Sequence, residues 1–233
     1  MKIDRKIEII IGVLFIIATV SSSLGFVISD PILNASDVLN SISTNIIQVI
    51  ISAVLLLINC VAVVAIPIFL FPVFKRDYET LALGYLGSRI IESVILIVGC
   101  IILLSLSSLS QEYVQAAVSD ASNYQTLGVL LISIYNWSIL VGIMIVFSLT
   151  ALLLNVWLYR SKSIPRWLSV WGLIGAIILL IEGLAETFGF ALTSILSLPI
   201  ALQEMVFACW VIVKGFNNLT LAGHPGRYRG VSA

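Results

Sequence analysis

The feature that most constrains this chain is a series of long apolar segments. Five of them reach the ~20 residues that an α-helix needs to cross ~30 Å of hydrocarbon, and a shorter sixth contains Gln203 and Glu204. The sequence favours helices over a barrel, because unpaired backbone groups are costly in lipid and no alternating pattern is present. We therefore predict an all-α, polytopic transmembrane bundle of six helices. Their expected limits are about 7–29, 46–71, 81–106, 126–158, 168–190 and 197–216.

Composition excludes a water-soluble globule. The 233 residues are 60% hydrophobic and 10% charged, whereas soluble domains carry about 25% charged residues. We expect a single membrane domain over residues 1–233, in which 217–233 form a flexible cytoplasmic tail. Lys and Arg together number 12, as do Asp and Glu, and no long basic run occurs, so we expect no nucleic-acid partner. The three cysteines lie in apolar segments, and their odd number does not indicate a disulfide framework.

The basic residues predict the orientation of the six helices. Positively charged residues of short loops stay in the cytoplasm. In a six-span chain every basic group outside the spans falls on one side, which places both termini in the cytoplasm. These groups are Lys2, Arg5 and Lys6; Lys75 and Arg76; Arg160, Lys162 and Arg166; and Lys214, Arg227 and Arg229. The opposite loops lack Lys and Arg and contain Asp30, Asp37, Glu112 and Asp120. Five or seven spans would break this agreement.

The first apolar segment has an alternative interpretation. Basic residues before an apolar run, followed by small residues from Ala18 to Ser23, also describe a cleaved signal peptide. The apolar stretch is longer than the hydrophobic region of a typical signal peptide. We therefore favour a retained transmembrane helix.

Five charged residues interrupt the apolar segments, where a charge at mid-bilayer costs from ~2.5 to more than ~10 kcal/mol. They are Arg89 and Glu92, Glu182 and Glu186, and Glu204. At ~1.5 Å per residue, Arg89 and Glu92 lie about 12 and 17 Å from the cytoplasmic end of their helix, Glu204 about 15 Å and Glu182 about 21 Å. Glu186 is one turn farther out, near the opposite interface. We expect a buried cluster of the first four charges between the third, fifth and sixth helices.

Two interpretations of this cluster remain open. In the structural one, Arg89 pairs with a glutamate and ties helices together, while Asn59, Asn136 and Gln203 add interhelical hydrogen bonds. The protein is then a scaffold or accessory subunit with an apolar face for an oligomeric or other membrane partner. In the functional one, a single cation faces three carboxylates, so two must be protonated, hydrated or matched by a ligand.

The functional interpretation predicts a polar cavity that handles protons or binds a cation, a small solute or a lipid. Tyr85 shares the helix face of Arg89 and Glu92 and belongs to this candidate site. An intramembrane enzyme is a third alternative. The sole histidine, His224, lies in the tail, so no His-based zinc site and no Ser-His or Cys-His pair can form in the bilayer. The sequence therefore identifies no catalytic residue, metal site or cofactor.

Three blocks of sequence resemble a known family. They are residues 71–97 (FPVFKRDYETLALGYLGSRIIESVILI), 159–175 (YRSKSIPRWLSVWGLIG) and 202–216 (LQEMVFACWVIVKGF). They are similar to the bacterial membrane proteins described as domain of unknown function 4386, and the likeness covers nearly the whole chain. The resemblance implies a multi-pass protein of the bacterial plasma (inner) membrane. It adds no catalytic residue, but Arg89, Glu92 and Glu204 lie within its blocks.

The predicted topology can be checked by labelling single introduced cysteines in a variant without the native ones. Asp37→Cys and Glu112→Cys are expected to react with an impermeant maleimide added outside intact cells. Lys75→Cys and Arg160→Cys should react only after the cells are opened, because basic loops stay inside. Labelling of all four positions from the same side would contradict the six-span arrangement.

Overall fold

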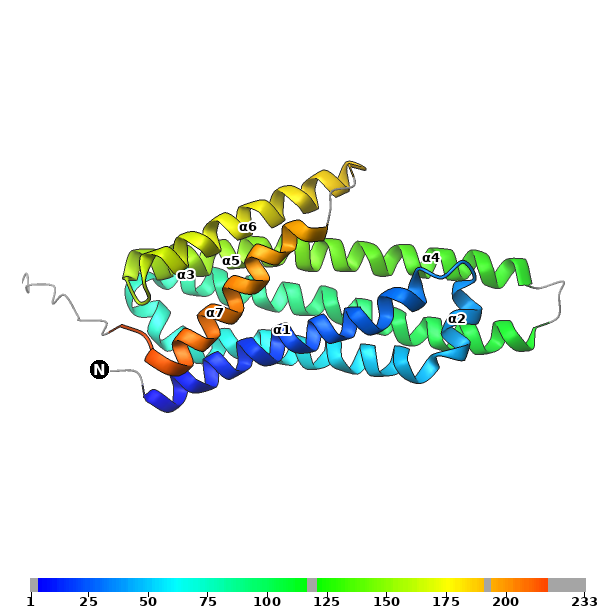
Figure 1. Cartoon of the computed structure of the whole chain (residues 1–233), viewed down its shortest axis with the longest axis horizontal. Helices are drawn as coiled ribbons and strands as arrows, with labels where there is room; N and C mark the ends of the chain where they lie inside the picture. The colour runs from blue at the N-terminus through cyan, green and yellow to red at the C-terminus, as the bar shows by residue number, and fades with distance from the viewer. Residues whose placement is uncertain (1–3, 117–120, 191–193, 218–233) are drawn as a thin grey trace, which may run out of the picture.

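The computed structural model describes residues 4–116, 121–190 and 194–217, which are all-helical as predicted. Its elements form an elongated bundle (Figure 1). In chain order they are α1 (Arg5–Leu33), α2 (Val38–Thr44), α3 (Ile46–Gln115), α4 (Ala121–Ile139), the π-helix η1 (Leu140–Val146), α5 (Phe147–Ser161), α6 (Arg166–Thr187), the 3₁₀ helix η2 (Ser194–Ser197) and α7 (Leu198–Lys214). The expected tail lies outside the described residues from 218 onward, His224 included.

Among the described residues, five helical stretches are long and apolar enough to cross a bilayer, which makes this a multi-pass membrane protein. They are Arg5–Leu33, Ile46–Arg76, Tyr78–Gln115, Ala121–Ser161 and Arg166–Thr187. Each coincides with one of the first five predicted helices. The sixth predicted segment forms α7, which has only 17 residues.

The turn expected between the second and third spans is a sharp kink within α3. The only non-helical backbone inside this helix is at Tyr78, with φ −150° and ψ 79°. We expected the second span to end near Pro67 and Pro72, but the helix continues through both prolines to Arg76. A helix in a membrane bundle can continue through prolines because neighbouring helices satisfy the backbone groups that a proline leaves without a hydrogen bond.

The polar stretch 107–125, expected as a loop, is largely helical. The described helices continue to Gln115 on one side and resume at Ala121 on the other. Their ends contact each other, because the rings of Tyr113 and Tyr124 lie 6.5 Å apart and Gln125 Nε2 donates to Tyr113 Oη at 3.2 Å. Polarity marks where the chain leaves the hydrocarbon, but it does not end a helix that still has a packing partner.

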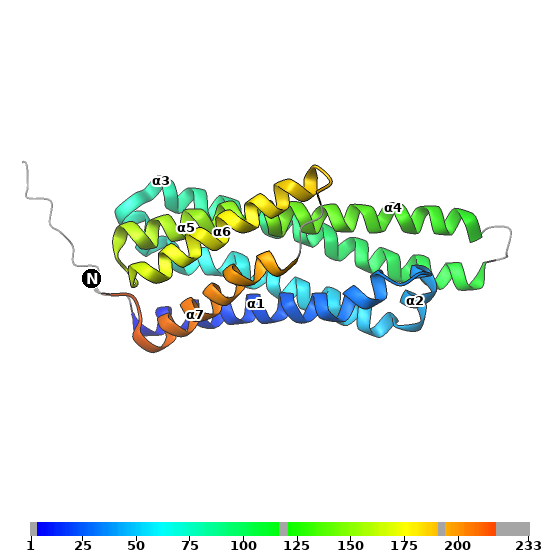
Figure 2. The same cartoon turned by 45° about the horizontal axis from the view of Figure 1, so that its top comes forward.

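One end of the bundle gathers the start of α1, the kink of α3, the turn between α5 and α6 and the end of α7 (Figures 1 and 2). At this end, Arg5 joins the start of α1 to the end of α7. Its Nη1 donates to Val211 O at 3.0 Å and to Glu8 Oε2 at 2.9 Å, and its Nη2 donates to Ile212 O. Glu8 Oε1 accepts from the backbone N–H of Phe216 at 3.0 Å. The two carbonyl bonds from Arg5 cap the end of α7, where Val211 O also accepts from the backbone N–H of Gly215 at 3.0 Å.

The main hydrophobic core lies toward this same end. Aromatic pairs run through it, with ring centroids 4.4 Å apart for Phe74 and Trp157 and 5.0 Å apart for Phe15 and Phe207. The pairs join α3 to α5 and α1 to α7. This packing fixes the helices that carry the buried charges.

Gly12 lets α1 approach α7 closely. A Cβ added there would lie 2.5 Å from Ile212 Cγ1 and 2.9 Å from the backbone oxygen of Ala208, whereas a Cβ at Gly87 would meet no atom within 4 Å. We predict that Gly12→Ala lowers the stability of the folded protein by about 1–3 kcal/mol through overpacking. Gly87→Ala, the matched control, should be neutral or stabilising by up to ~1 kcal/mol. Thermal unfolding in detergent measures both, and equal melting temperatures would contradict the close approach.

Candidate functional site

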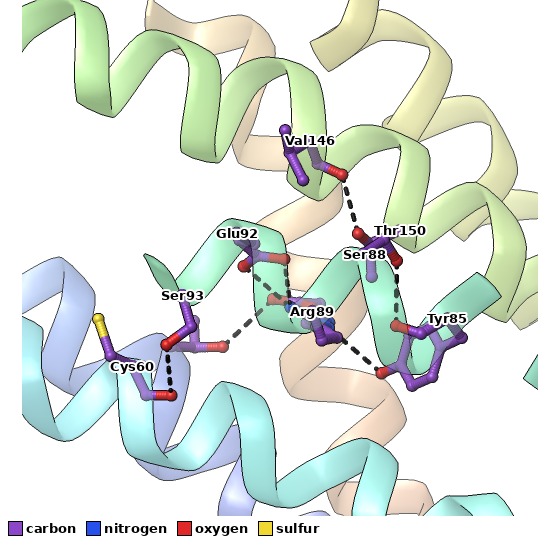
Figure 3. Close-up of polar contacts among 10 residues, drawn as sticks. Cys60, Tyr85, Ser88, Arg89, Glu92, Ser93, Val146 and Thr150 are labelled. Carbon is purple, nitrogen blue, oxygen red and sulfur yellow. Dashed lines mark hydrogen bonds and ion pairs between the residues drawn. The ribbon is translucent and has the colours of Figure 1, made fainter. Parts of the chain in front are cut away.

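Arg89 is the centre of a buried polar cluster in the second half of α3. Its Nη1 donates to both carboxylate oxygens of Glu92, at 3.1 and 3.2 Å, and its Nε donates to Tyr85 Oη at 3.4 Å. Figure 3 shows Arg89 lying between these two side chains. The spacing of three and four residues puts all three on one helix face, as predicted from the sequence. Nη2 of Arg89 lies 3.7 Å from Glu204 Oε1 on α7, which confirms the expected pairing with that helix.

Two further helices contribute contacts that sequence reasoning missed. Thr19 of α1 donates its hydroxyl to Glu204 Oε2 at 3.4 Å. The ring of Phe147, at the start of α5, lies 5.3 Å from Arg89 Cζ, within cation–π distance. Neither residue carries a distinguishing sequence signal, because hydroxyl and aromatic side chains are common in membrane helices. The cluster therefore joins α1, α3, α5 and α7.

The cluster contains two carboxyl groups and one guanidinium. Arg89 and Glu92 are 2% and 3% exposed, and the Glu204 side chain is 16% exposed. If both carboxylates ionise, one guanidinium faces two of them in surroundings of low dielectric, where an unmatched charge is costly. Glu204 is the more distant partner of Arg89. A proton or an external cation could therefore neutralise it while the Arg89–Glu92 pair stays intact.

Glu182 does not join this cluster. Within the described residues no ion pair connects it to Arg89, and the helices that α6 packs against are α5, α7, η1 and η2, not α3. Glu182 is 2% exposed, and its Oε2 has no hydrogen-bond partner in the described part of the chain. We expected the third, fifth and sixth spans to meet around Arg89, but the fifth span, α6, does not. Two helices whose charged residues lie at equal depth in the bilayer need not be neighbours.

Gln203 makes the interhelical hydrogen bonds expected of it. Its Nε2 donates to Asn155 Oδ1 on α5 at 3.4 Å and to Leu168 O on α6 at 3.3 Å. Gly172 leaves room for Asn155, since a Cβ there would lie 2.2 Å from Asn155 Oδ1. Asn59 is buried in the first half of α3 and has no hydrogen bond to the Arg89 cluster.

Glu186 lies elsewhere, at a cavity of about 320 Å³ between α1, α4, η1 and α6. Asp30 and Asn136 also line this cavity, whereas Arg89, Glu92, Glu182 and Glu204 do not. The polar cavity found here is therefore separate from the cluster around which we expected one. Residues 4–116, 121–190 and 194–217 bring together no group of three His, Cys, Asp or Glu side chains that could hold a metal ion.

Loss of the buried cation should be far more damaging than loss of an exposed one. We predict that Arg89→Gln destabilises the protein by about 3–5 kcal/mol, because it leaves Glu92 and Glu204 without a counter-ion. Arg160→Gln, at an exposed arginine, should cost less than about 1 kcal/mol. Thermal unfolding of the purified variants measures the difference. Similar losses for the two would show that the guanidinium does not hold the bundle together.

Comparison with known proteins gives one match. A model of the family described as Domain of unknown function (DUF4386) matches residues 10–215, which include the whole Arg89 cluster and all the described spans except the first five residues of α1. No curated protein and no solved structure matches the chain. The extent of the family match means that the chain belongs to the family described as Domain of unknown function (DUF4386).

Proposed function

We propose that this protein crosses the bacterial plasma membrane six times, with both termini in the cytoplasm. The 17 residues of α7 fall within the ~17–25 that a transmembrane helix uses. The end of α7 is hydrogen-bonded to the start of α1 through Arg5. The basic residues at the helix ends share that end of the bundle (Figure 2). Cytoplasmic retention of basic loops supports its assignment to the inside.

We further propose that the protein binds or transports a small solute, a cation or a lipid, and that its inner carboxylates exchange protons or hold the cation. The observation that carries this proposal is the excess of carboxylates. Glu92, Glu182 and Glu204 share the interior with one guanidinium, that of Arg89. Because a carboxylate in low dielectric must be paired, protonated or hydrated, two of the three need a proton, water or a ligand cation.

Glu204 is suited to couple such an exchange to movement. It contacts Arg89 of α3 and Thr19 of α1, and both contacts are longer than those of the Arg89–Glu92 pair. Neutralising Glu204 would weaken the attachment of α7 to α3 and leave Glu92 in place. Binding of a proton or a cation to Glu204 can thus change the position of α7 relative to its neighbours. A ligand-dependent shift between conformations requires such a difference.

The alternative is a structural role, and the burial of the cluster favours it. Arg89 and Glu92 are nearly inaccessible, and the cavity lined by Glu186 does not reach them. In that case the cluster only ties helices together, and exposed apolar faces contact a membrane partner or another copy of the chain. Val61 and Ile101, which are 72% and 57% exposed, lie on such faces of α3.

Dicyclohexylcarbodiimide separates carboxyl groups that carry a proton from those that are paired, because it reacts with protonated carboxyls in apolar surroundings. We expect it to label Glu182 and Glu204, more strongly at pH 6 than at pH 8, and to spare Glu92 beside Arg89. Mass spectrometry of peptides locates the label. Glu182→Gln and Glu204→Gln should each remove one label and keep the melting temperature within a few degrees.

The functional proposal also requires that these variants change an activity, and not only the stability of the fold. Wild-type protein in liposomes with an internal pH dye should move protons when members of a panel of amines, amino acids and inorganic cations are added. Glu182→Gln and Glu204→Gln should reduce that movement severalfold, whereas Glu112→Gln, at an exposed position outside the bundle core, should not. Variants that alter only thermal stability, with no proton movement in the wild type, would support the structural alternative.

A further inference from the structure

The cavity near Glu186 differs from the Arg89 cluster in place and in access. It lies between the ends of α1 and α6, the second half of α4 and the π-helix η1, and no described residue of α7 lines it. Ile200 in the first turn of α7 packs on Gly175, and Glu186 is 11 residues farther along α6. At ~1.5 Å per residue along α6, Ile200 packs about 16 Å short of the level of Glu186. The cavity therefore lies beyond the start of α7, in the half of the bundle away from the basic residues (Figure 1).

Negative charge dominates this cavity. Asp30 and Glu186 line it, both side chains are exposed, and its lining contains no Lys or Arg. Asn34 Nδ2 donates to Asp30 Oδ1 at 2.8 Å, which orients that carboxylate and leaves its other oxygen free of protein hydrogen bonds in the described chain. The adjoining sequence 30–45 also lacks basic residues. Such a cavity attracts a cation and repels an anion.

Tyr135 supplies an independent indication of a ligand. Its side chain lines the cavity and is 4% exposed, and its buried hydroxyl makes no hydrogen bond of normal geometry in the described residues, although it lies beside Ser29, which also lines the cavity. Buried hydroxyl groups are normally hydrogen-bonded, so this one indicates a missing donor or acceptor. The phenol ring and the ring of Phe26, also in the lining, can face a cation as well.

We propose that this cavity, which we call the outer acidic cavity, binds a protonated organic amine. The ammonium group pairs with Asp30 and Glu186 and donates to the Tyr135 hydroxyl. The organic part lies against Phe26 and Met144. This names a ligand class for the binding role proposed above and rests on that role, but it uses none of the carboxylates around Arg89.

Size and chemistry favour an amine over other cations. A volume of about 320 Å³ lies at the lower end of the ~300–1,000 Å³ typical of organic ligand sites. A bare metal ion would leave most of this space empty, and the described residues offer no three-ligand group for one. The amine can come from a free solute or from the headgroup of an ethanolamine lipid, because both present an ammonium group.

The test uses 2-phenylethylammonium chloride with the whole protein in phosphatidylglycerol nanodiscs, followed by thermal unfolding and calorimetric titration. We expect saturable binding and a rise in melting temperature, and no effect from phenylacetate, its anionic analogue. Asp30→Asn combined with Glu186→Gln should weaken binding by about tenfold, since each partly exposed charge pair contributes modestly. Tyr135→Phe should weaken it severalfold and leave unliganded stability unchanged or higher, because it removes an unpaired buried hydroxyl.

Controls separate this inference from the exchange proposed for the inner carboxylates. Glu112→Gln, outside the lining, should bind normally. Proton movement in Glu182→Gln and Glu204→Gln tests the inner carboxylates by a different measurement, so either proposal can fail while the other stands. Nanodiscs containing phosphatidylethanolamine should weaken apparent binding of the probe if the natural ligand is the headgroup, and leave it unchanged if the ligand is a free amine. Equal effects of phenylacetate and phenylethylammonium, or full binding by the Asp30→Asn, Glu186→Gln double variant, would overturn the proposal.

Discussion

The burial of one guanidinium constrains the arrangement of this bundle more than any other single interaction. Arg89 can stay in an apolar interior only because Glu92 is on its own helix face and Glu204 reaches it from α7. Thr19 and Phe147 complete the surroundings from α1 and α5. Four helices meet at this level, and removal of the guanidinium itself would leave the carboxylates buried without a counter-ion.

The two ends of the bundle use carboxylates in different ways. Toward the basic end, aromatic packing and α7 enclose the Arg89 cluster and exclude solvent. Beyond the start of α7 fewer helices are present, and the outer acidic cavity opens beside Asp30 and Glu186. The π-helix η1 lies at the boundary: Met144 lines the cavity and also packs on Gly183, the neighbour of the buried Glu182. Such π-helical turns occur often at functional sites, because they shift side chains relative to a regular helix.

Much of the fold could be predicted because lipid imposes simple rules on a chain. Hydrophobic length located every described helix that can span, and the local spacing of Arg89 and Glu92 predicted that they share one helix face. Predictions failed where polar sequence was equated with loop. The stretch around Tyr78 is a kink in a helix that runs through Pro72, and helices extend far into 107–125. Tertiary contacts sustain helices there although the local sequence would permit a turn.

The sequence by itself determined which segments enter the membrane, on which side the basic residues gather, and which charges lie at similar depth. These properties depend on the composition of single segments and on distance along one helix. Only the tertiary structure decided that Glu204 meets Arg89 while Glu182 does not, that Thr19 completes the cluster, and that Tyr135 shares a cavity with two distant carboxylates. Lateral order among helices comes from the fit of whole packed surfaces, which hydrophobic length and depth leave undetermined.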